Sequence, residues 1–196
     1  PAGKVFPYEE DIRVPFAIRG PGIPEGRVVE ELAVNIDIAP TIAALAGIET
    51  PGFVDGRSLL PLLAGSPPAW RTSFLIERQQ LETQIRKLAR RRGMTPGQIE
   101  RAAVFRGLRT ADMVYVEHAT GERELYNLAT DPHQLANLAG GADPAELAKL
   151  SARLSELATC AGAECRRLED LPIAPAPRLI TEKPSGGTLT PAAVQN

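Results

Sequence analysis

The sequence is poor in several residue types on which particular classes of protein depend. Its 196 residues include two cysteines, two histidines and one tryptophan, and aromatic residues make up only 5%. No apolar stretch approaches the roughly 20 residues that cross a bilayer as a helix, so we expect no transmembrane span. Basic and acidic residues number 22 and 24, and the resulting net charge of −2 argues against a dedicated nucleic-acid or membrane-surface binder.

The remaining composition is that of an ordinary soluble globular protein. Hydrophobic residues make up 43% and charged residues 23%, and 18 prolines with 17 glycines predict many loops. This balance excludes a collagen, a coiled coil and a wholly disordered chain. The first residues contain neither an initiator methionine nor a charged and then apolar leader. We therefore expect the sequence to be the interior of a longer protein.

The first third of the chain predicts the end of an α/β layer. Residues 12–19 carry apolar side chains and run into Gly-Pro-Gly, which predicts a short buried strand, and residues 28–34 predict an edge strand. Asp37 occupies the N-cap position of a helix that ends at Gly47, and a cap is a better interpretation of this residue than a metal ligand. Another short helix is expected over residues 57–64.

The rest of the chain predicts a small α+β unit. Residues 73–76 predict a strand. Three further apolar runs, at residues 104–110, 113–118 and 124–128, follow one another directly, which is typical of an antiparallel meander. A last helix is expected from the Asp143-Pro144 start to Thr159, with four leucines on one face. Between the first two strands, five basic residues crowd the end of a helix that stops at Gly93, and Thr95 begins a second helix with a capping box.

The two cysteines, Cys160 and Cys165, favour a small disulfide loop after the last helix, with two free thiols as the alternative. A zinc site would need two more ligands, and His118 and His133 stand in separate turn-like segments, so neither histidine is given a role. A disulfide would place the parent protein in an oxidising compartment.

Several motifs follow one another in a characteristic order. They are Gly3-Lys4 with Pro7-Tyr8-Glu9-Glu10-Asp11-Ile12-Arg13-Val14-Pro15, Asn35-Ile36-Asp37, Asp55-Gly56-Arg57-Ser58, Trp70-Arg71-Thr72 and Glu124-Leu125-Tyr126-Asn127-Leu128. In this order the chain resembles the C-terminal part of the sulfatases, within the alkaline-phosphatase superfamily. The segment around the two cysteines is similar to the end of the N-acetylglucosamine-6-sulfatase group.

This resemblance implies a fold and a chemistry. The fold is α/β: the end of an alkaline-phosphatase-like sheet in residues 1–66, an antiparallel α+β subdomain in 67–168 with a basic helical insertion at 78–103, and an irregular tail in 169–196. The resemblance also implies a formylglycine nucleophile and a calcium ion, both held by a part of the protein that precedes this chain, and no metal ligand on the chain itself.

Lys4 is the one residue of the chain that the resemblance places at the reacting group, as a sulfate-binding cation. A fixed ammonium stabilises the negative charge on the oxygens of a transferring sulfuryl group. As a weaker hypothesis, Arg90, Arg91 and Arg92 attract a sulfated glycan near the mouth of the site. A solvated helix face and a DNA-reading helix-turn-helix are the alternatives for this basic segment.

The sequence thus predicts the C-terminal part of a sulfatase of the secreted, periplasmic or lysosomal type. Its substrate would be a sulfate monoester of a glycan or amino sugar, or a small sulfate ester, and the chain alone would be inactive. A phosphoester hydrolase of the same superfamily and a non-catalytic glycan-binding or structural module are the alternatives.

Overall fold

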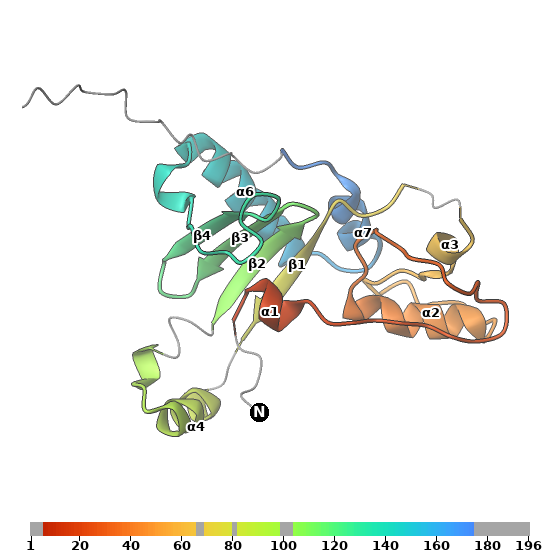
Figure 1. Ribbon diagram of the computed structural model, residues 1–196, viewed down its shortest axis with the longest axis horizontal. Coiled ribbons are helices and arrows are strands. Elements are labelled where there is room, and N and C mark those ends of the chain that lie inside the picture. The colour runs from red at the N-terminus through yellow and green to blue at the C-terminus, as the bar shows by residue number, and fades with distance from the viewer. Residues whose placement is uncertain (1–5, 66–68, 80–81, 99–103, 175–196) are drawn as a thin grey trace, which may run out of the picture.

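A four-stranded antiparallel sheet organises the chain. The computed structural model describes residues 6–65, 69–79, 82–98 and 104–174. The strands are paired in chain order, so each has its sequence neighbour beside it (Figure 1). They are β1 (Ser73–Arg78), β2 (Phe105–Thr110), β3 (Met113–His118) and β4 (Arg123–Asn127). The meander that the sequence predicts is confirmed.

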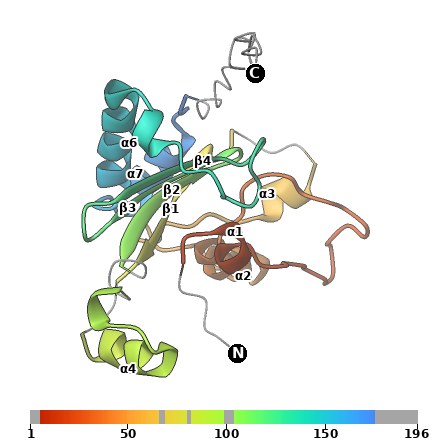
Figure 2. The ribbon, with the colours of Figure 1, turned by 60° about the vertical axis from the view of Figure 1, so that its left-hand side comes forward.

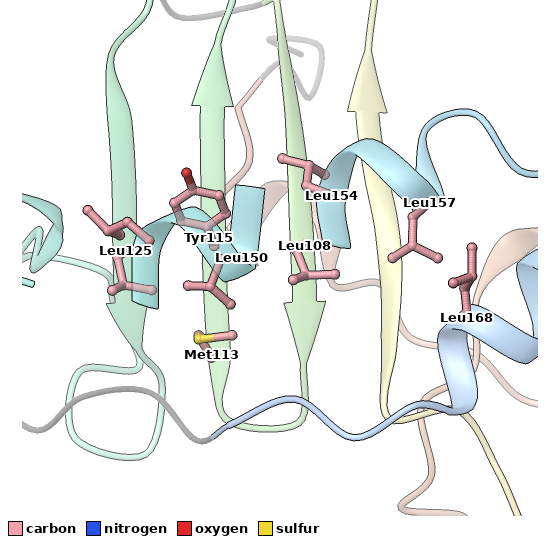
Figure 3. Close-up of a cluster of buried hydrophobic side chains, with 9 residues drawn as sticks. Leu108, Met113, Tyr115, Leu125, Leu150, Leu154, Leu157 and Leu168 are labelled. Atoms are coloured by element: carbon pink, nitrogen blue, oxygen red, sulfur yellow. The ribbon is translucent and has the colours of Figure 1, made fainter. Parts of the chain in front are cut away.

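One face of the sheet is covered by the last two helices, α6 (Pro144–Leu157) and α7 (Ala163–Asp170). The four predicted leucines of α6 are buried against the strand side chains that point to this face of the sheet. Leu168 of α7 belongs to the same cluster. Figure 3 shows this cluster between the helices and the sheet, and its strand members are Leu108, Met113, Tyr115 and Leu125. Burial of so many large side chains makes this the main core.

The opposite face carries the first part of the chain. Figure 2 shows α1 (Glu9–Ile12) and α2 (Ile38–Leu45) on the side of the sheet away from α6. The strand residues on this face form a smaller apolar cluster of Phe105, Val114 and Val116. The remaining short elements are η1 (Asn35–Asp37), α3 (Leu60–Leu63), α4 (Glu82–Arg92) and η2 (Ala139–Gly141). No helix in the described ranges is long and apolar enough to cross a membrane.

Several predicted helix boundaries agree with the structure. The Asp143 side chain accepts a hydrogen bond from the Ala145 N–H at 2.9 Å and so caps α6. Thr95 and Gln98 form the predicted capping box, with backbone-to-side-chain distances of 2.8 and 3.2 Å. At the end of α4, Gly93 has φ 63° and the Met94 N–H donates to the Ala89 carbonyl at 3.0 Å. That pattern is a Schellman motif, which requires a residue with positive φ at this place.

Two predicted strands, over residues 12–19 and 28–34, are wrong. The structure gives neither segment any strand or helix beyond Ile12, which ends α1. No described strand lies beside them to pair with their backbone groups, and a strand is stable only in a ladder. Their apolar side chains are exposed as a result: Val14 is 58% and Val28 77% accessible.

Helix α7 was not predicted. It begins between the two cysteines, so that Cys165 lies within it, and it includes Glu169 and Asp170, which the sequence assigns to the tail. Cys160 and Cys165 are joined by a disulfide with a Cα separation of 5.1 Å, in agreement with the prediction. The bond ties the end of α6 to α7. The boundary between the first two predicted domains stays a prediction.

Candidate functional site

The segment that follows Lys4 is held on the second face of the sheet. Lys4 itself lies outside the described residues. The Phe6 N–H donates to the Asp11 carboxylate at 2.8 Å, which closes the single turn of α1. Pro7 is fully buried, and the acidic side chains Glu9, Glu10 and Asp11 all fall in the first turn of the helix, where the helix dipole favours negative charge.

Glu9 makes the strongest contacts between this segment and the sheet. Its two carboxylate oxygens accept hydrogen bonds from Nε and Nη2 of Arg109, at 2.8 and 3.1 Å. The side chains are only 12% (Arg109) and 14% (Glu9) exposed. The Glu9 backbone N–H also donates to Oε1 of Gln134, at 2.7 Å. A two-point Arg–carboxylate contact fixes orientation as well as distance, so the position of α1 on β2 is defined.

Glu124 of β4 collects a second set of contacts. Its Oε1 lies 3.0 Å from Nε2 of His118 and accepts a hydrogen bond from the Tyr8 hydroxyl at 3.4 Å. Its Oε2 accepts from the Tyr126 hydroxyl at 3.1 Å. Burial raises the pKa of Tyr8, and the charge of Glu124 raises it further, so this hydroxyl remains a donor at neutral pH. Arg109, His118 and Glu124 together form the set of sheet side chains that holds the α1 segment, and this set is called the cradle below. His118, to which the sequence gives no role, is thus part of it.

The strand pairing explains why these residues share a face. Phe105 lies opposite His118, Arg109 lies opposite Val114, and Val114 in turn lies opposite Tyr126. Because side chains alternate between faces, Arg109, His118 and Glu124 point to the side where α1 lies. That alternation is visible in the sequence, but nothing in it indicates that their partners are Tyr8 and Glu9.

A shallow pocket of about 220 Å³ opens next to the Glu9–Arg109 pair. Arg13 and Asp112 complete its charged lining, and Arg13 is exposed. Two guanidinium groups therefore face two carboxylates, so the charges of the lining balance. Such a pocket has no net charge with which to attract a sulfate ester.

A buried network of ion pairs surrounds Arg71, and it is structural. Arg71 donates from Nη1 and Nη2 to the two carboxylate oxygens of Asp37, and from Nε to Glu169 at 2.9 Å. The side chains of Arg71 and Asp37 are fully buried. Burial lowers the pKa of Arg71, but its hydrogen bonds to Asp37 and the charge of Glu169 outweigh it, so the pKa is raised overall.

This network accounts for two of the sequence motifs. Asp37 precedes α2, but its side chain makes no cap hydrogen bond to that helix and instead accepts from the backbone N–H groups of Val34 and Arg57, at 2.9 and 3.0 Å. Arg57 also reaches Glu169, at 3.1 Å. At Gly56 a Cβ would overlap the Ile36 carbonyl, so only glycine fits there. Asp37 is thus structural, as predicted, though by a contact that the sequence did not indicate.

The predicted site residues on the basic helix lie at one end of the sheet. Arg90 and Arg91 are exposed on α4, whereas Arg92 is partly buried. Its guanidinium carbon lies 5.8 Å from the centre of the Phe6 ring. The structure therefore brings the end of α4 next to the segment that follows Lys4. Within the described ranges, no group of three or more histidine, cysteine or carboxylate side chains is arranged to hold a metal ion.

The family follows from comparison with known proteins. The family profile described as N-sulphoglucosamine sulphohydrolase, C-terminal, matches residues 3–159, which is more than half of the chain. The chain belongs to this family of sulfatase C-terminal regions. The match spans α1, the four strands and α6 of the sulfatase chain, including every residue of the cradle around Glu9 and Glu124.

Individual relatives of the sulfatase chain are much longer than it is. The N-acetylglucosamine-6-sulfatase of Bos taurus is 35% identical over 177 residues, 81% of this chain and 31% of that protein. The extracellular sulfatase SULF-1 homolog of Drosophila melanogaster is 47% identical over 103 residues, 50% of this chain and 9% of that protein. A phosphonate monoester hydrolase from Silicibacter pomeroyi has a solved structure that is 34% identical, with 70% of this chain and 26% of that chain covered and a TM-score of 0.48. The chain thus spans less than a third of these proteins.

Proposed function

We propose that this chain is the C-terminal part of a sulfatase that hydrolyses sulfate monoesters of a glycan or amino sugar. Membership of the family over residues 3–159 carries the proposal. The relatives named N-acetylglucosamine-6-sulfatase support a 6-sulfated amino sugar as the substrate. In this proposal Lys4 binds the sulfate group, and its ammonium offsets the charge that develops on the sulfuryl oxygens.

The geometry supports this role for the segment around Lys4. A cation stabilises a transition state well only if it is held in place before the reaction. Residues 6–12 begin two positions after Lys4, and the contacts of Glu9 with Arg109 and of Tyr8 with Glu124 attach them to the rigid sheet. The C-terminal sheet would therefore serve as the support of the sulfate-binding residue.

Calcium and formylglycine would be supplied by a part of the sulfatase outside this chain. In this proposal the chain itself contributes the sulfate-binding lysine and its support. Exposed apolar side chains between Val14 and Phe53 support packing against such a part. They include Val14 (58% accessible), Val28 (77%), Ile42 (60%) and Phe53 (79%). Apolar exposure on this scale is typical of an interface.

An oxidising compartment completes the proposal. The Cys160–Cys165 disulfide is the kind of bond that persists outside the reducing cytosol. Relatives named as extracellular sulfatases support export of the parent protein. We therefore place it in the secreted, periplasmic or lysosomal class.

The test is release of sulfate by the full polypeptide that contains this chain. We expect hydrolysis of N-acetylglucosamine 6-sulfate and slower hydrolysis of the corresponding phosphate ester. Lys4→Ala should lower kcat by about 100-fold, as loss of a preorganised charge contact does, and Lys149→Ala, which removes an exposed lysine of α6, should leave it unchanged. Preference for the phosphate ester would favour the phosphoester hydrolase, and no hydrolysis of either would favour the non-catalytic module.

A further inference from the structure

One face of α4 is formed almost entirely by cations. Arg86, Lys87, Arg90 and Arg91 are all exposed and follow the i, i+1, i+4, i+5 pattern of neighbours on a helix surface. Ala89, in contrast, is only 2% exposed, so the helix also has a buried side. The basic surface, defined here as Lys87, Arg90 and Arg91, therefore faces solvent.

The charge of this surface is not balanced locally. The sequence has no acidic residue between Glu82 and Glu100. Among the residues that the structure describes, Lys87, Arg90 and Arg91 have no carboxylate partner. Like charges four positions apart, such as Lys87 and Arg91, destabilise a helix, and the helix dipole compensates only in the last turn. Helix stability alone does not account for this arrangement, so a role in binding is the better explanation.

The position of α4 relates the basic surface to the Lys4 segment. Arg92, the last residue of the helix, lies with its guanidinium carbon 5.8 Å from the centre of the Phe6 ring. Burial lowers the pKa of Arg78, at the end of β1; the charge of Asp11 opposes this shift and that of Arg92 adds to it. Figures 1 and 2 both show α4 standing clear of the body beyond the ends of β1 and β2.

We propose that the basic surface of α4 binds a second, non-reacting portion of a multiply sulfated glycan chain while the reacting sulfate is held near Lys4. This inference rests on the proposed function, which it extends from a sulfated sugar to a polyanionic chain. Sulfate groups are ionised at all physiological pH values, and guanidinium groups bind them through two parallel hydrogen bonds. A cluster of cations beside a site also raises the local concentration of an anionic substrate.

The observations favour a glycan over a nucleic acid. A helix-turn-helix reads DNA with its second helix, in the major groove. Here the cations lie on the first helix, and the described start of the second, Thr95 to Gln98, has no charged residue. The net charge of −2 for the whole chain also differs from the broadly basic character of nucleic-acid binders.

The experiment uses the full polypeptide and a heparin octasaccharide as the probe. The test variant carries Lys87→Ser, Arg90→Ser and Arg91→Ser. The control variant carries Arg123→Ser, Lys149→Ser and Arg167→Ser, which removes the same charge from exposed positions outside α4. We expect the test variant to bind the octasaccharide about tenfold more weakly at low salt, with the slope of log affinity against log salt reduced by about 2 to 3. The control should bind as the unmodified protein does.

Kinetics separate this surface from the reacting site. The test variant should raise KM for a sulfated oligosaccharide about tenfold, because binding of the chain is lost, and leave kcat and KM for para-nitrophenyl sulfate unchanged. Equal binding by the test and control variants would overturn the inference. So would tighter binding of the unmodified protein to single-stranded DNA than to heparin. Heparin binding that depends on α4, in a protein that hydrolyses no sulfate ester, would refute the proposed function instead.

Discussion

Glu9 and Arg109 are separated by 100 residues in the sequence and joined by two hydrogen bonds of 2.8 and 3.1 Å. Their pairing connects the first helix of the chain to the second strand of the sheet. Since Glu9 follows Lys4 by five positions, the same pair also sets how firmly the predicted sulfate-binding segment is attached. The contact thus attaches α1 to the sheet, and in the proposed function it also supports the segment that carries Lys4.

Arg109→Ala should destabilise the chain by about 3 kcal/mol, because it leaves a largely buried carboxylate on Glu9 without its partner. The matched control is Arg106→Ala on the same strand, where the side chain is 48% exposed and lies 3.8 Å from Glu77. The control should cost less than about 1 kcal/mol. Urea unfolding of the two variants measures the difference, and equal losses would contradict the role assigned to the pair.

Arg71→Ala should cost about 3 to 5 kcal/mol, since it leaves both Asp37 and Glu169 buried without their shared cation. Arg167→Ala is the matched control on α7, where the Arg167 and Glu164 side chains are 57% and 53% exposed. We expect the control to change stability by less than about 1 kcal/mol. Thermal unfolding followed by circular dichroism compares them, and a small effect of Arg71→Ala would show that the network is dispensable.

Replacing Cys160 and Cys165 together by serine should lower the free energy of unfolding by about 2 kcal/mol, the loop-closure value for so short a loop. The native, unreduced protein should contain no free thiol, and two should appear after reduction in denaturant. A thiol reagent measures both states. Two thiols in the native protein would contradict the disulfide and with it the argument for an oxidising compartment.

Sequence patterns predicted the elements that are stabilised within this chain. The four leucines of α6 repeat at helical spacing because they pack on the sheet. Strands such as β3 are short continuous apolar runs because both faces of the sheet are covered. Residues 12–19 have a similar apolar pattern, but none of the strands that the structure describes lies beside them, so the same reasoning failed there. Helix α7 was missed because Cys165 and Leu168 are the only apolar buried residues of a mostly polar stretch.

The candidate site was harder to predict for a related reason. Periodicity indicates which face of a strand a residue occupies, but not which distant segment covers that face. Arg109 could be assigned to a face of β2, whereas its partner Glu9 could not. The buried Arg71 was singled out as part of a motif, and its partners Asp37 and Glu169 were assigned to a helix cap and to the tail.

The three tyrosines of the chain should titrate well above their ordinary pKa of about 10. Burial raises the pKa of Tyr8, Tyr115 and Tyr126, and neighbouring glutamates raise it further. An acid whose pKa is raised by folding binds its proton more tightly in the native state, so stability is retained below pH of about 10 and falls as the pH rises beyond it. The ultraviolet absorbance of tyrosinate should therefore appear at higher pH in the native protein than in urea.

Two variants test the cause of that shift. Glu124→Gln removes the negative charge beside Tyr8 and Tyr126, so it should lower the pKa of these two hydroxyls and leave Tyr115 unchanged. Glu117→Gln should act on Tyr115 instead, because its carboxylate accepts the Tyr115 hydroxyl at 2.7 Å. If the native protein and both variants titrated as the chain does in urea, the hydroxyls would be solvated, and Tyr8 could not be held against Glu124 as the cradle for the Lys4 segment requires.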